Sequence, residues 1–459
     1  MTTTPTMTEP TTAPKVSAPL TPELLARLAA SFEAEPAYRL AQNAVTQTPV
    51  TDVTLNRSVI ASTDHTFSNM LDDWTVTNQK KSGRCWMFAG LNLLRVGAMK
   101  KMNIKDFEFS QNHTLFWDKL ERANYFLEAI IQTAYRPADD RLVAWLLDHP
   151  LEDGGQWNMF VNVIRKHGLV PKAFMPETES SSNTRQMNAV VIAKLQEAAR
   201  ILRDLRAGGA PMEAALAARD ETLQVIYRIL SIHLGTPPRR IDWQWTDKDK
   251  GFHRDGEMTP LEFADAYVDL PLDDYVCLVN DPRESSPYGR TFTVDFLGNV
   301  VGGEIVKYLN IELGLMKQIA METITGGEPV WFGCDVGKMM RRDLGIWDAE
   351  LFDYEGLYDT SFGLDKAQRL VYHQTLMTHA MLFTGVDVVN GKPRRWRVEN
   401  SWGEENGRKG FYVMNDSWFD QHMFEIAARR SALSEELQEA LELEPIVLPA
   451  WDPMGSLAG

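Results

Sequence analysis

The segment Asn78-Gln79-Lys80-Lys81-Ser82-Gly83-Arg84-Cys85-Trp86 stands directly before an apolar helical pattern in this 459-residue sequence. Apolar side chains recur after it at intervals of three and four residues, at Met87, Leu91, Leu94 and Ala98. This spacing predicts a helix with one buried face that begins near Cys85. A helix N-terminus carries partial positive charge, which favours the thiolate that attacks carbonyl carbon. Cys85 is therefore a candidate nucleophile, although a buried cysteine at a helix start is more often inert packing.

Gln79 adds a second feature that acyl-transfer chemistry needs. The tetrahedral intermediate of such a reaction carries a negative oxygen that must be met by hydrogen-bond donors. Gln79 precedes Cys85 by six residues across a turn, so its side-chain amide and the Cys85 backbone N–H can serve together. We expect Gln79 to contribute to an oxyanion hole.

His379 is the best candidate for a base among the nine histidines. It opens the apolar run His379-Ala380-Met381-Leu382-Phe383, which predicts a strand. The motif Asn400-Ser401-Trp402-Gly403 follows 21 residues later. Asn400 can accept a hydrogen bond from the imidazole and hold its tautomer, while Trp402 shields that bond from water. His373 is the close rival, but it lacks the strand context.

These motifs together resemble papain-like cysteine peptidases. Ser82-Gly83-Arg84-Cys85-Trp86 is similar to their signature Cys-Gly-Ser/Ala-Cys-Trp/Tyr, with Ser82 in place of a cysteine that is usually half of a disulfide in secreted relatives. The base lies 294 residues after Cys85 instead of about 130–150, so roughly 150 residues are inserted. With this insertion and with Arg84 before the nucleophile, the sequence resembles the bleomycin hydrolase/aminopeptidase C family. The resemblance implies an α+β, two-lobed papain-like fold with a helical insertion.

The chain divides into five expected parts. Helical patterns are found at 21–44, from Cys85 onward, and at 115–134, 142–149, 159–167, 187–205 and 212–233. Short strand-like runs dominate the part after residue 275, at 275–279, 291–296, 329–334, 379–386, 394–399 and 410–415. A Thr-rich stretch at 45–63 is expected to be extended. We expect a disordered tail (1–20), a helical lobe with Cys85 (21–175), a helical insertion for oligomerisation (176–254), a β-rich lobe with His379 and Asn400 (255–433), and a C-terminal helix and arm (434–459).

The resemblance implies functions for two further segments. Asp153-Gly154-Gly155-Gln156-Trp157 is similar to the strand that binds the substrate backbone in the family, because glycine permits close approach of a peptide; a plain Gly-Gly turn is the alternative. The Pro-rich end, Glu444 to Gly459, resembles an arm that enters the cleft. The carboxylate of Ala458 or Gly459, depending on trimming, would then face the substrate's ammonium group. An arm packed on the surface is the alternative.

Composition limits the remaining possibilities. The net charge of −16 argues against nucleic acid as the main partner, and no run approaches the roughly 18–20 apolar residues of a membrane span. Three sparse cysteines (Cys85, Cys277 and Cys334) do not form a disulfide framework, and the N-terminus lacks the apolar core of a secretory signal. We therefore expect a cytoplasmic protein without a membrane segment.

The sequence thus predicts a cysteine aminopeptidase that works through a Cys85 acyl-enzyme, with no metal or organic cofactor. Peptides would be its substrates, and the family resemblance implies a homohexameric ring. Two alternatives stay open: an endopeptidase of the same family, in which the arm leaves the cleft free, and a non-catalytic ring scaffold.

Overall fold

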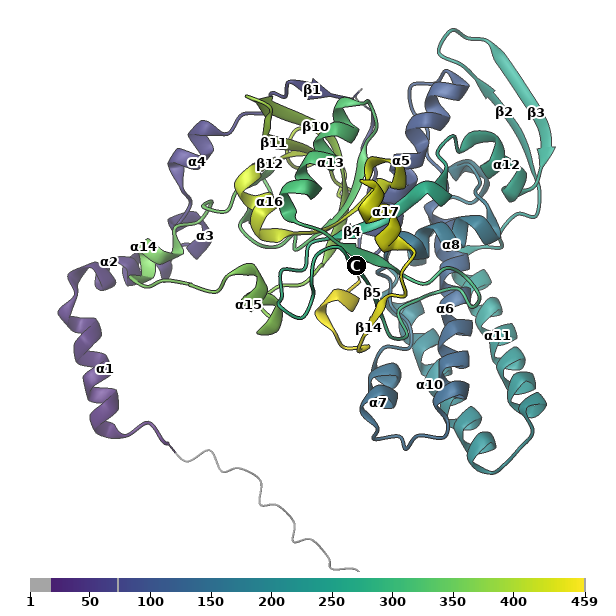
Figure 1. Ribbon diagram of the computed structural model, residues 1–459, viewed down its shortest axis with the longest axis horizontal. Helices are drawn as coiled ribbons and strands as arrows, with labels where there is room; N and C mark the ends of the chain where they lie inside the picture. The colour runs from purple at the N-terminus through teal and green to yellow at the C-terminus, as the bar shows by residue number, and fades with distance from the viewer. Residues whose placement is uncertain (1–17, 72–73, 458–459) are drawn as a thin grey trace, which may run out of the picture. The chain divides into compact units, whose positions relative to one another are not determined.

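The computed structural model describes residues 18–71 and 74–457 (Figure 1). Within the described residues the chain forms two compact units, one of residues 18–56 with Phe352–Phe362 and one of residues 57–351 with 363–457 apart from 72 and 73. Most of the expected disordered tail and both candidate terminal residues, Ala458 and Gly459, lie outside the described residues.

The small unit contains short helices: α1 (Pro22–Ala34), α2 (Pro36–Val45), α3 (Val50–Val53) and α14 (Tyr354–Tyr358). The helical pattern predicted for residues 21–44 is broken at Glu35, which is extended (φ −106°, ψ 108°). Glu35 precedes Pro36, and the proline ring disfavours helical backbone in the residue before it. The prediction of an extended stretch at 45–63 is wrong, because α3 and, in the large unit, α4 (Arg57–Ser62) lie within it.

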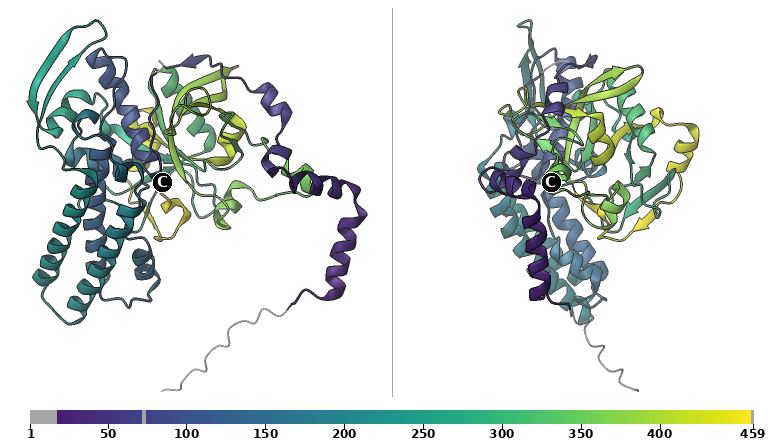
Figure 2. Two further views of the ribbon diagram at one scale, coloured as in Figure 1. Left: turned by 180° about the vertical axis from the view of Figure 1, so that it is seen from behind. Right: turned by 90° about the vertical axis from the view of Figure 1, so that its left-hand side faces the viewer.

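The first half of the large unit is mainly helical. Its helices are α5 (Cys85–Met102), α6 (Gln111–Thr133), α7 (Arg141–Asp148), α8 (Trp157–His167), α9 (Glu179–Ser182), α10 (Arg185–Ala207), α11 (Met212–Leu234) and α12 (Pro260–Tyr267). The long helices α10 and α11 form a hairpin that packs along α6 (Figure 2). Leu195, Leu202, Ile226 and Leu230 are buried in this contact, as their helical spacing predicts.

The second half is built on one sheet. Within the described residues, its strands run in the order β14-β5-β6-β4-β13-β7-β10-β11-β12-β9-β8, and β1 pairs with β10. The strands are β1 (Asn69–Met70), β4 (Tyr275–Val279), β5 (Arg290–Val294), β6 (Tyr308–Asn310), β7 (Val330–Cys334), β8 (Met340–Arg341), β9 (Ile346–Trp347), β10 (His379–Val389), β11 (Lys392–Glu399), β12 (Phe411–Asn415), β13 (Met423–Arg429) and β14 (Ile446–Leu448). The six predicted strands are confirmed as β4, β5, β7, β10, β11 and β12. The hairpin of β2 (Ile241–Thr246) and β3 (Phe252–Met258) was not predicted.

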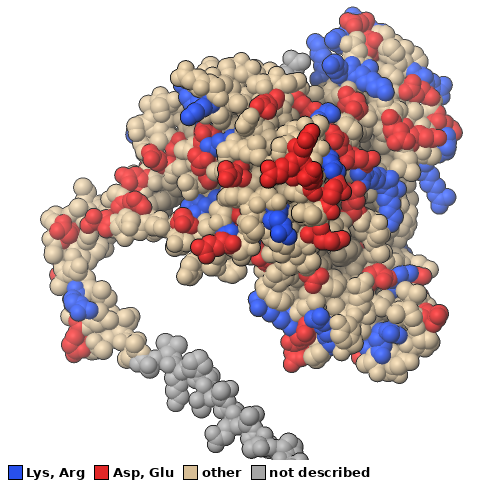
Figure 3. Space-filling model, viewed as in Figure 1, with Lys and Arg blue, Asp and Glu red and all other residues tan. Residues whose placement is uncertain are grey.

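Helices cover the sheet and complete the second half. They are α13 (Leu313–Thr325), α15 (Lys366–Val371), α16 (Asp416–His422) and α17 (Glu435–Leu441). Helices α13 and α16 pack on the sheet at β10 and at β11 and β12, respectively (Figure 1). Acidic side chains gather over α17 on the face shown in Figure 3. Helices in the first half and strands in the second make the fold α+β, as predicted.

Helix α5 joins the two halves at one point of the core. It packs on β7 and β10, and the Trp331 indole N–H of β7 donates to the Trp86 carbonyl at 3.0 Å. Trp157 of α8 lies against Trp331, with ring centroids 5.9 Å apart. Because these side chains are fully buried, the N-terminus of α5 is held rigidly against the start of β10.

Two features are absent from the part of the chain that the structure describes. None of their helices combines the length and apolarity needed to span a membrane. No group of three or more His, Cys, Asp and Glu side chains in residues 18–71 and 74–457 is placed to hold a metal ion.

Candidate active site

Cys85 is the first residue of α5, as the sequence predicts. Arg84 occupies the N-cap without a side-chain cap, so backbone N–H groups of the first turn are left to act on the sulfur. Burial raises the pKa of the Cys85 thiol to about 12, while hydrogen bonds from the backbone of Ala380 and Trp86 act in the lowering direction. The Ala380 N–H donates to Cys85 Sγ at 3.3 Å. All three cysteines are free thiols.

His379 opens β10 and is held by Asn400. Its Nε2 lies 3.0 Å from Asn400 Oδ1, so this nitrogen carries the proton and Nδ1 is left for another partner. The ring lies beside Trp402, with centroids 5.0 Å apart. Burial lowers the pKa of His379 to about 4, and the hydrogen bond to Asn400 acts in the raising direction. Since Ala380 follows His379, its bond to Cys85 Sγ brings the sulfur next to the residue that bears the imidazole.

Gln79 is fixed between the two halves. Its side-chain N–H donates to the Ser82 carbonyl and its side-chain oxygen accepts from Ser401 Oγ, each at 2.5 Å. The Gln79 backbone N–H also donates to the Ser401 carbonyl at 2.8 Å. Gln79 and His379 line one open cleft, together with Ser82, Gly83 and Trp402. Four residues predicted from separate motifs, Gln79, Cys85, His379 and Asn400, are thus gathered at one place.

Gly155 lies against the indole of Trp86, the neighbour of Cys85. A Cβ atom on Gly155 would come within 2.6 Å of the Trp86 ring, so only glycine fits without displacing it. Trp86 donates from its indole to the Asp153 carbonyl at 2.7 Å, and Arg122 donates to the Gly154 carbonyl at 2.5 Å. Packing therefore explains Gly155 independently of any ligand.

Arg84 braces the loop before Cys85, a role that the sequence did not reveal. The side chain is fully buried and forms two hydrogen bonds with Glu177, at 3.0 and 2.6 Å. Its Nε donates to Ser82 Oγ at 2.8 Å, and that hydroxyl donates to the Gln79 carbonyl at 2.6 Å. Ser82 is thus a hydrogen-bond relay at the position where secreted relatives have a cysteine.

Asp153 ties the same loop to the base of the α10 hairpin. It accepts a hydrogen bond from the Gly83 N–H at 3.1 Å and pairs with Lys119 at 2.6 Å. Thr184 and Asn188, at the start of α10, also donate to it. Asp153 therefore connects the nucleophile loop to the start of α10.

Glu399, the residue before Asn400, is a buried hub that the sequence analysis also missed. It accepts hydrogen bonds from Asn92 at 2.9 Å and Arg95 at 2.8 Å, both on α5, and from the Trp74 indole at 2.7 Å. Burial raises its pKa, against the lowering effect of Arg95. The helix that carries Cys85 is thereby tied to the strand that leads into Asn400.

The C-terminal arm reaches this site. After β14 it forms the turn Pro453–Gly455, and Tyr308 donates to the Met454 carbonyl at 3.1 Å. Gln156, next to Gly155, donates to the Ser456 carbonyl at 2.7 Å. Ser456 Oγ donates to the carbonyl of Met377, two residues before His379, also at 2.7 Å. The arm therefore bridges the two walls of the site.

A thiol at a helix N-terminus, beside a histidine whose ring is oriented by asparagine, is the arrangement of a papain-like cysteine peptidase. Comparison with known proteins agrees with this class. The sequence profile of the Peptidase C1-like family matches residues 19–455. The chain therefore belongs to the Peptidase C1-like family, which confirms the predicted family and fold class.

The similar proteins cover almost the whole chain. It is 43% identical over 449 residues to bleomycin hydrolase of Gallus gallus, covering 96% of this chain and 99% of the relative. Aminopeptidase C of Streptococcus thermophilus is 43% identical over 440 residues, with the same coverage. The crystal structure of PepW from Lactobacillus rhamnosis is 45% identical with a TM-score of 0.95, covering 96% of this chain and 100% of that one.

Proposed function

We propose that this protein is a cysteine aminopeptidase that removes N-terminal residues from peptides. Its most similar relatives include proteins named aminopeptidase C and bleomycin hydrolase. The observation that carries the aminopeptidase assignment is the position of Ser456. It is hydrogen-bonded to Gln156 on one wall of the site and to Met377 on the other, so the arm occupies space that a longer N-terminal extension of the substrate would need.

Cys85 is the proposed nucleophile and His379 its base. Burial alone disfavours either ion, as the raised thiol pKa and the lowered imidazole pKa indicate. Transfer of the thiol proton to Nδ1 of His379 instead creates two opposite charges side by side, which attract strongly in a site of low dielectric constant. The Ala380 N–H already bonded to the sulfur stabilises the thiolate further.

The reaction then follows the usual course of acyl transfer. The thiolate attacks the carbon of the scissile carbonyl. The carbonyl oxygen becomes negative and accepts hydrogen bonds from the Gln79 amide and the Cys85 backbone N–H. The C–N bond breaks as His379 returns its proton to the leaving amine. A water molecule, deprotonated by His379, hydrolyses the thioester and frees the N-terminal residue. Asn400 keeps the ring oriented throughout, and Trp402 covers their hydrogen bond.

Substrate placement follows from the same residues. Gly154 and Gly155 offer backbone groups to an extended peptide. The arm at Ser456, held between Gln156 and Met377, limits how far the N-terminus of the substrate can extend and so fixes the cleavage position at one residue. If the enzyme binds mainly the backbone of the peptide, the peptide side chains contribute little to binding, so broad specificity is expected.

We also propose a homohexamer in the cytoplasm. The α10–α11 hairpin carries exposed apolar side chains, including Val190, Tyr227 and Ile232, which suit an interface between copies. Three free thiols suit a reducing compartment. Native mass spectrometry would test the assembly, and a monomer at micromolar concentration would refute it.

The activity is tested with matched peptides that carry a free or an acetylated N-terminus. The wild type is expected to release single residues from the free peptide only. Cys85→Ala should lose at least about 10⁴-fold in kcat/KM, because the covalent route is removed. Deletion of Leu457–Gly459 should open the acetylated peptide to cleavage. Full activity in Cys85→Ala would refute the nucleophile, and an unchanged preference for free N-termini after the deletion would refute the role of the arm.

A further inference from the structure

The arm approaches the site through a stretch with a single charged side chain. Between Glu444 and Gly459 the only ionisable side chain is that of Asp452. Asp452 stands four residues before Ser456, at the start of the last turn. Whatever holds Asp452 therefore determines where the remaining residues enter the cleft.

Arg283 holds Asp452 with a two-pronged ion pair. Its two terminal nitrogens donate to the two carboxylate oxygens at 3.0 and 2.8 Å. Both side chains are about nine-tenths buried, with exposed fractions of 10% for Arg283 and 9% for Asp452. A bidentate pair of this kind fixes direction as well as distance, because both N–H···O bonds must align at once.

Arg283 is itself immobilised by the end of the central sheet. It bonds to both oxygens of Asp281 at 2.7 to 3.1 Å. The backbone of Asp281 is hydrogen-bonded in both directions to the buried Asn310 side chain at the end of β6, at 2.9 Å each. Arg283 and Asp281 lie in the loop after β4, and Asn310 anchors this loop to the end of β6.

The chain beyond Asp452 has little freedom to shift. Asp452 caps the turn by accepting from the Met454 N–H at 2.9 Å, and its backbone carbonyl accepts from the Gly455 N–H at 2.8 Å. Gly455 packs so closely on β5 that a Cβ atom would approach Val294 to 2.9 Å. The turn thus transmits the position of Asp452 to Ser456.

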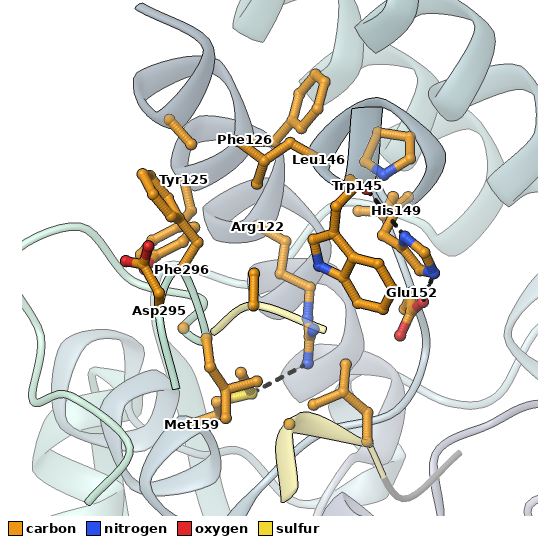
Figure 4. Close-up of a pocket in the computed structure, with 18 residues that line it drawn as sticks. Arg122, Tyr125, Phe126, Trp145, Leu146, His149, Glu152, Met159, Asp295 and Phe296 are labelled. Carbon is orange, nitrogen blue, oxygen red and sulfur yellow. Dashed lines mark hydrogen bonds and ion pairs between the residues drawn. The ribbon is translucent and has the colours of Figure 1, made fainter. Parts of the chain in front are cut away.

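The apolar contacts of the arm cannot set its register by themselves. Ala450, Gly455 and Leu457 line a cavity that is otherwise walled by helices α6 and α7 and the loop at Phe296 (Figure 4). Such contacts are non-directional, so a displacement of one residue, about 3.3–3.6 Å, would exchange one apolar contact for another. An ion pair with two aligned hydrogen bonds does not allow that displacement.

We infer that the Arg283–Asp452 pair is the register anchor of the arm, a positioning device that fixes how many residues the enzyme releases. The inference rests on the proposed aminopeptidase function. Loss of the pair leaves the arm held only by the hydrogen bonds of Met454 and Ser456 and by apolar contacts. The arm is then displaced in part of the molecules, so that two-residue products and cleavage of blocked peptides appear beside the normal products, while the chemistry at Cys85 is unchanged.

Asp452→Asn tests the anchor, because asparagine keeps the shape and the cap but removes the charge. The products released from a free peptide are identified by mass spectrometry, and kcat/KM is compared for free and acetylated peptides. We expect dipeptide products and a rise of about tenfold in the acetylated-to-free ratio, the size of effect that loss of a charge-assisted pair produces. The titre of reactive thiol should stay at the wild-type value.

Two further variants make the result decisive. Arg283→Lys keeps the positive charge but cannot form the two parallel hydrogen bonds to Asp452. It should shift the products in the same direction, and it tests the anchor if Asp452→Asn does not fold. Glu328→Gln breaks the more exposed Arg429–Glu328 pair at the end of β13, away from the arm, and should leave the products unchanged. If Asp452→Asn and Arg283→Lys both release single residues only, while deletion of Leu457–Gly459 does change the products, the Arg283–Asp452 pair is not the register anchor. If the deletion itself has no effect, the proposed function fails instead.

Discussion

Replacing Glu177 by glutamine should both destabilise the protein and slow catalysis. Arg84 is fully buried, and Glu177, whose side chain is 21% exposed, is the carboxylate that neutralises it. Removing one partner of a buried ion pair costs about 3–5 kcal/mol because the other charge is left uncompensated. Glutamine retains one acceptor and the site is partly open to water, so we expect a smaller loss, about 2–3 kcal/mol.

The catalytic effect follows from the route Glu177–Arg84–Ser82–Gln79. Each link is a hydrogen bond of 3.0 Å or less, so a shift of Arg84 reaches both the oxyanion donor and the backbone before Cys85. A displacement near 1 Å in such a site can cost about 100-fold in rate. We expect kcat to fall roughly 10- to 100-fold, with a smaller change in KM.

Steady-state kinetics and urea unfolding measure the two effects. Glu128→Gln is the matched control: Glu128 is also 21% exposed and pairs with Arg219, but it lies in the contact between α6 and α11, which does not include the nucleophile loop. That variant should change stability by less than about 1 kcal/mol and leave kcat intact. Wild-type stability and kcat in Glu177→Gln, or equal damage in Glu128→Gln, would refute the reasoning.

Three other outcomes are expected. Gly155→Ala should cost about 1–3 kcal/mol and most of the activity, because its methyl group meets the Trp86 ring at 2.6 Å; unchanged kcat/KM would contradict this. Asn400→Ala should reduce kcat at least about tenfold while the rate of Cys85 alkylation stays at the wild-type value, and a changed alkylation rate would instead indicate a rearranged site. Burial raises the pKa of Glu425 to about 8, so the folded state keeps a proton that the unfolded chain loses above about pH 4.5. Stability should fall as pH rises from about 4.5 to 8, by up to roughly 1.4 kcal/mol per unit from this group. Glu425→Gln should flatten that slope in urea midpoints measured at pH 5 and pH 8, and an unaltered slope would count against the buried acid.

Much of the site could be predicted because its chemistry is encoded in short motifs. Cys85 with Gln79, and His379 with Asn400, each belong to a local pattern of strand, turn or helix signals. The spacing of apolar residues likewise gave the α10–α11 hairpin and the main strands of the sheet.

The missed features depend on residues that are distant in the sequence. Glu177 pairs with Arg84 across 93 positions, and Glu399 meets Arg95 across 304. No local pattern predicts such partners, because any surface charge has the same appearance in the sequence. Strand β13 is buried along almost its whole length and so lacks the alternation that marks a half-exposed strand. Strand β3 was not predicted for the opposite reason: most of its residues are exposed, so it also lacks the alternation.

Glu399 has a consequence for how a peptide gains access. Its hydrogen bonds to Asn92 and Arg95 join helix α5, which carries Cys85, to the end of β11 next to Asn400, and all of these side chains are buried. Hinge opening between these halves would strand a carboxylate and a guanidinium without partners, at a cost of several kcal/mol. The reactive groups therefore wait in their working positions before any peptide arrives. The free energy of peptide binding need not be spent on assembling them.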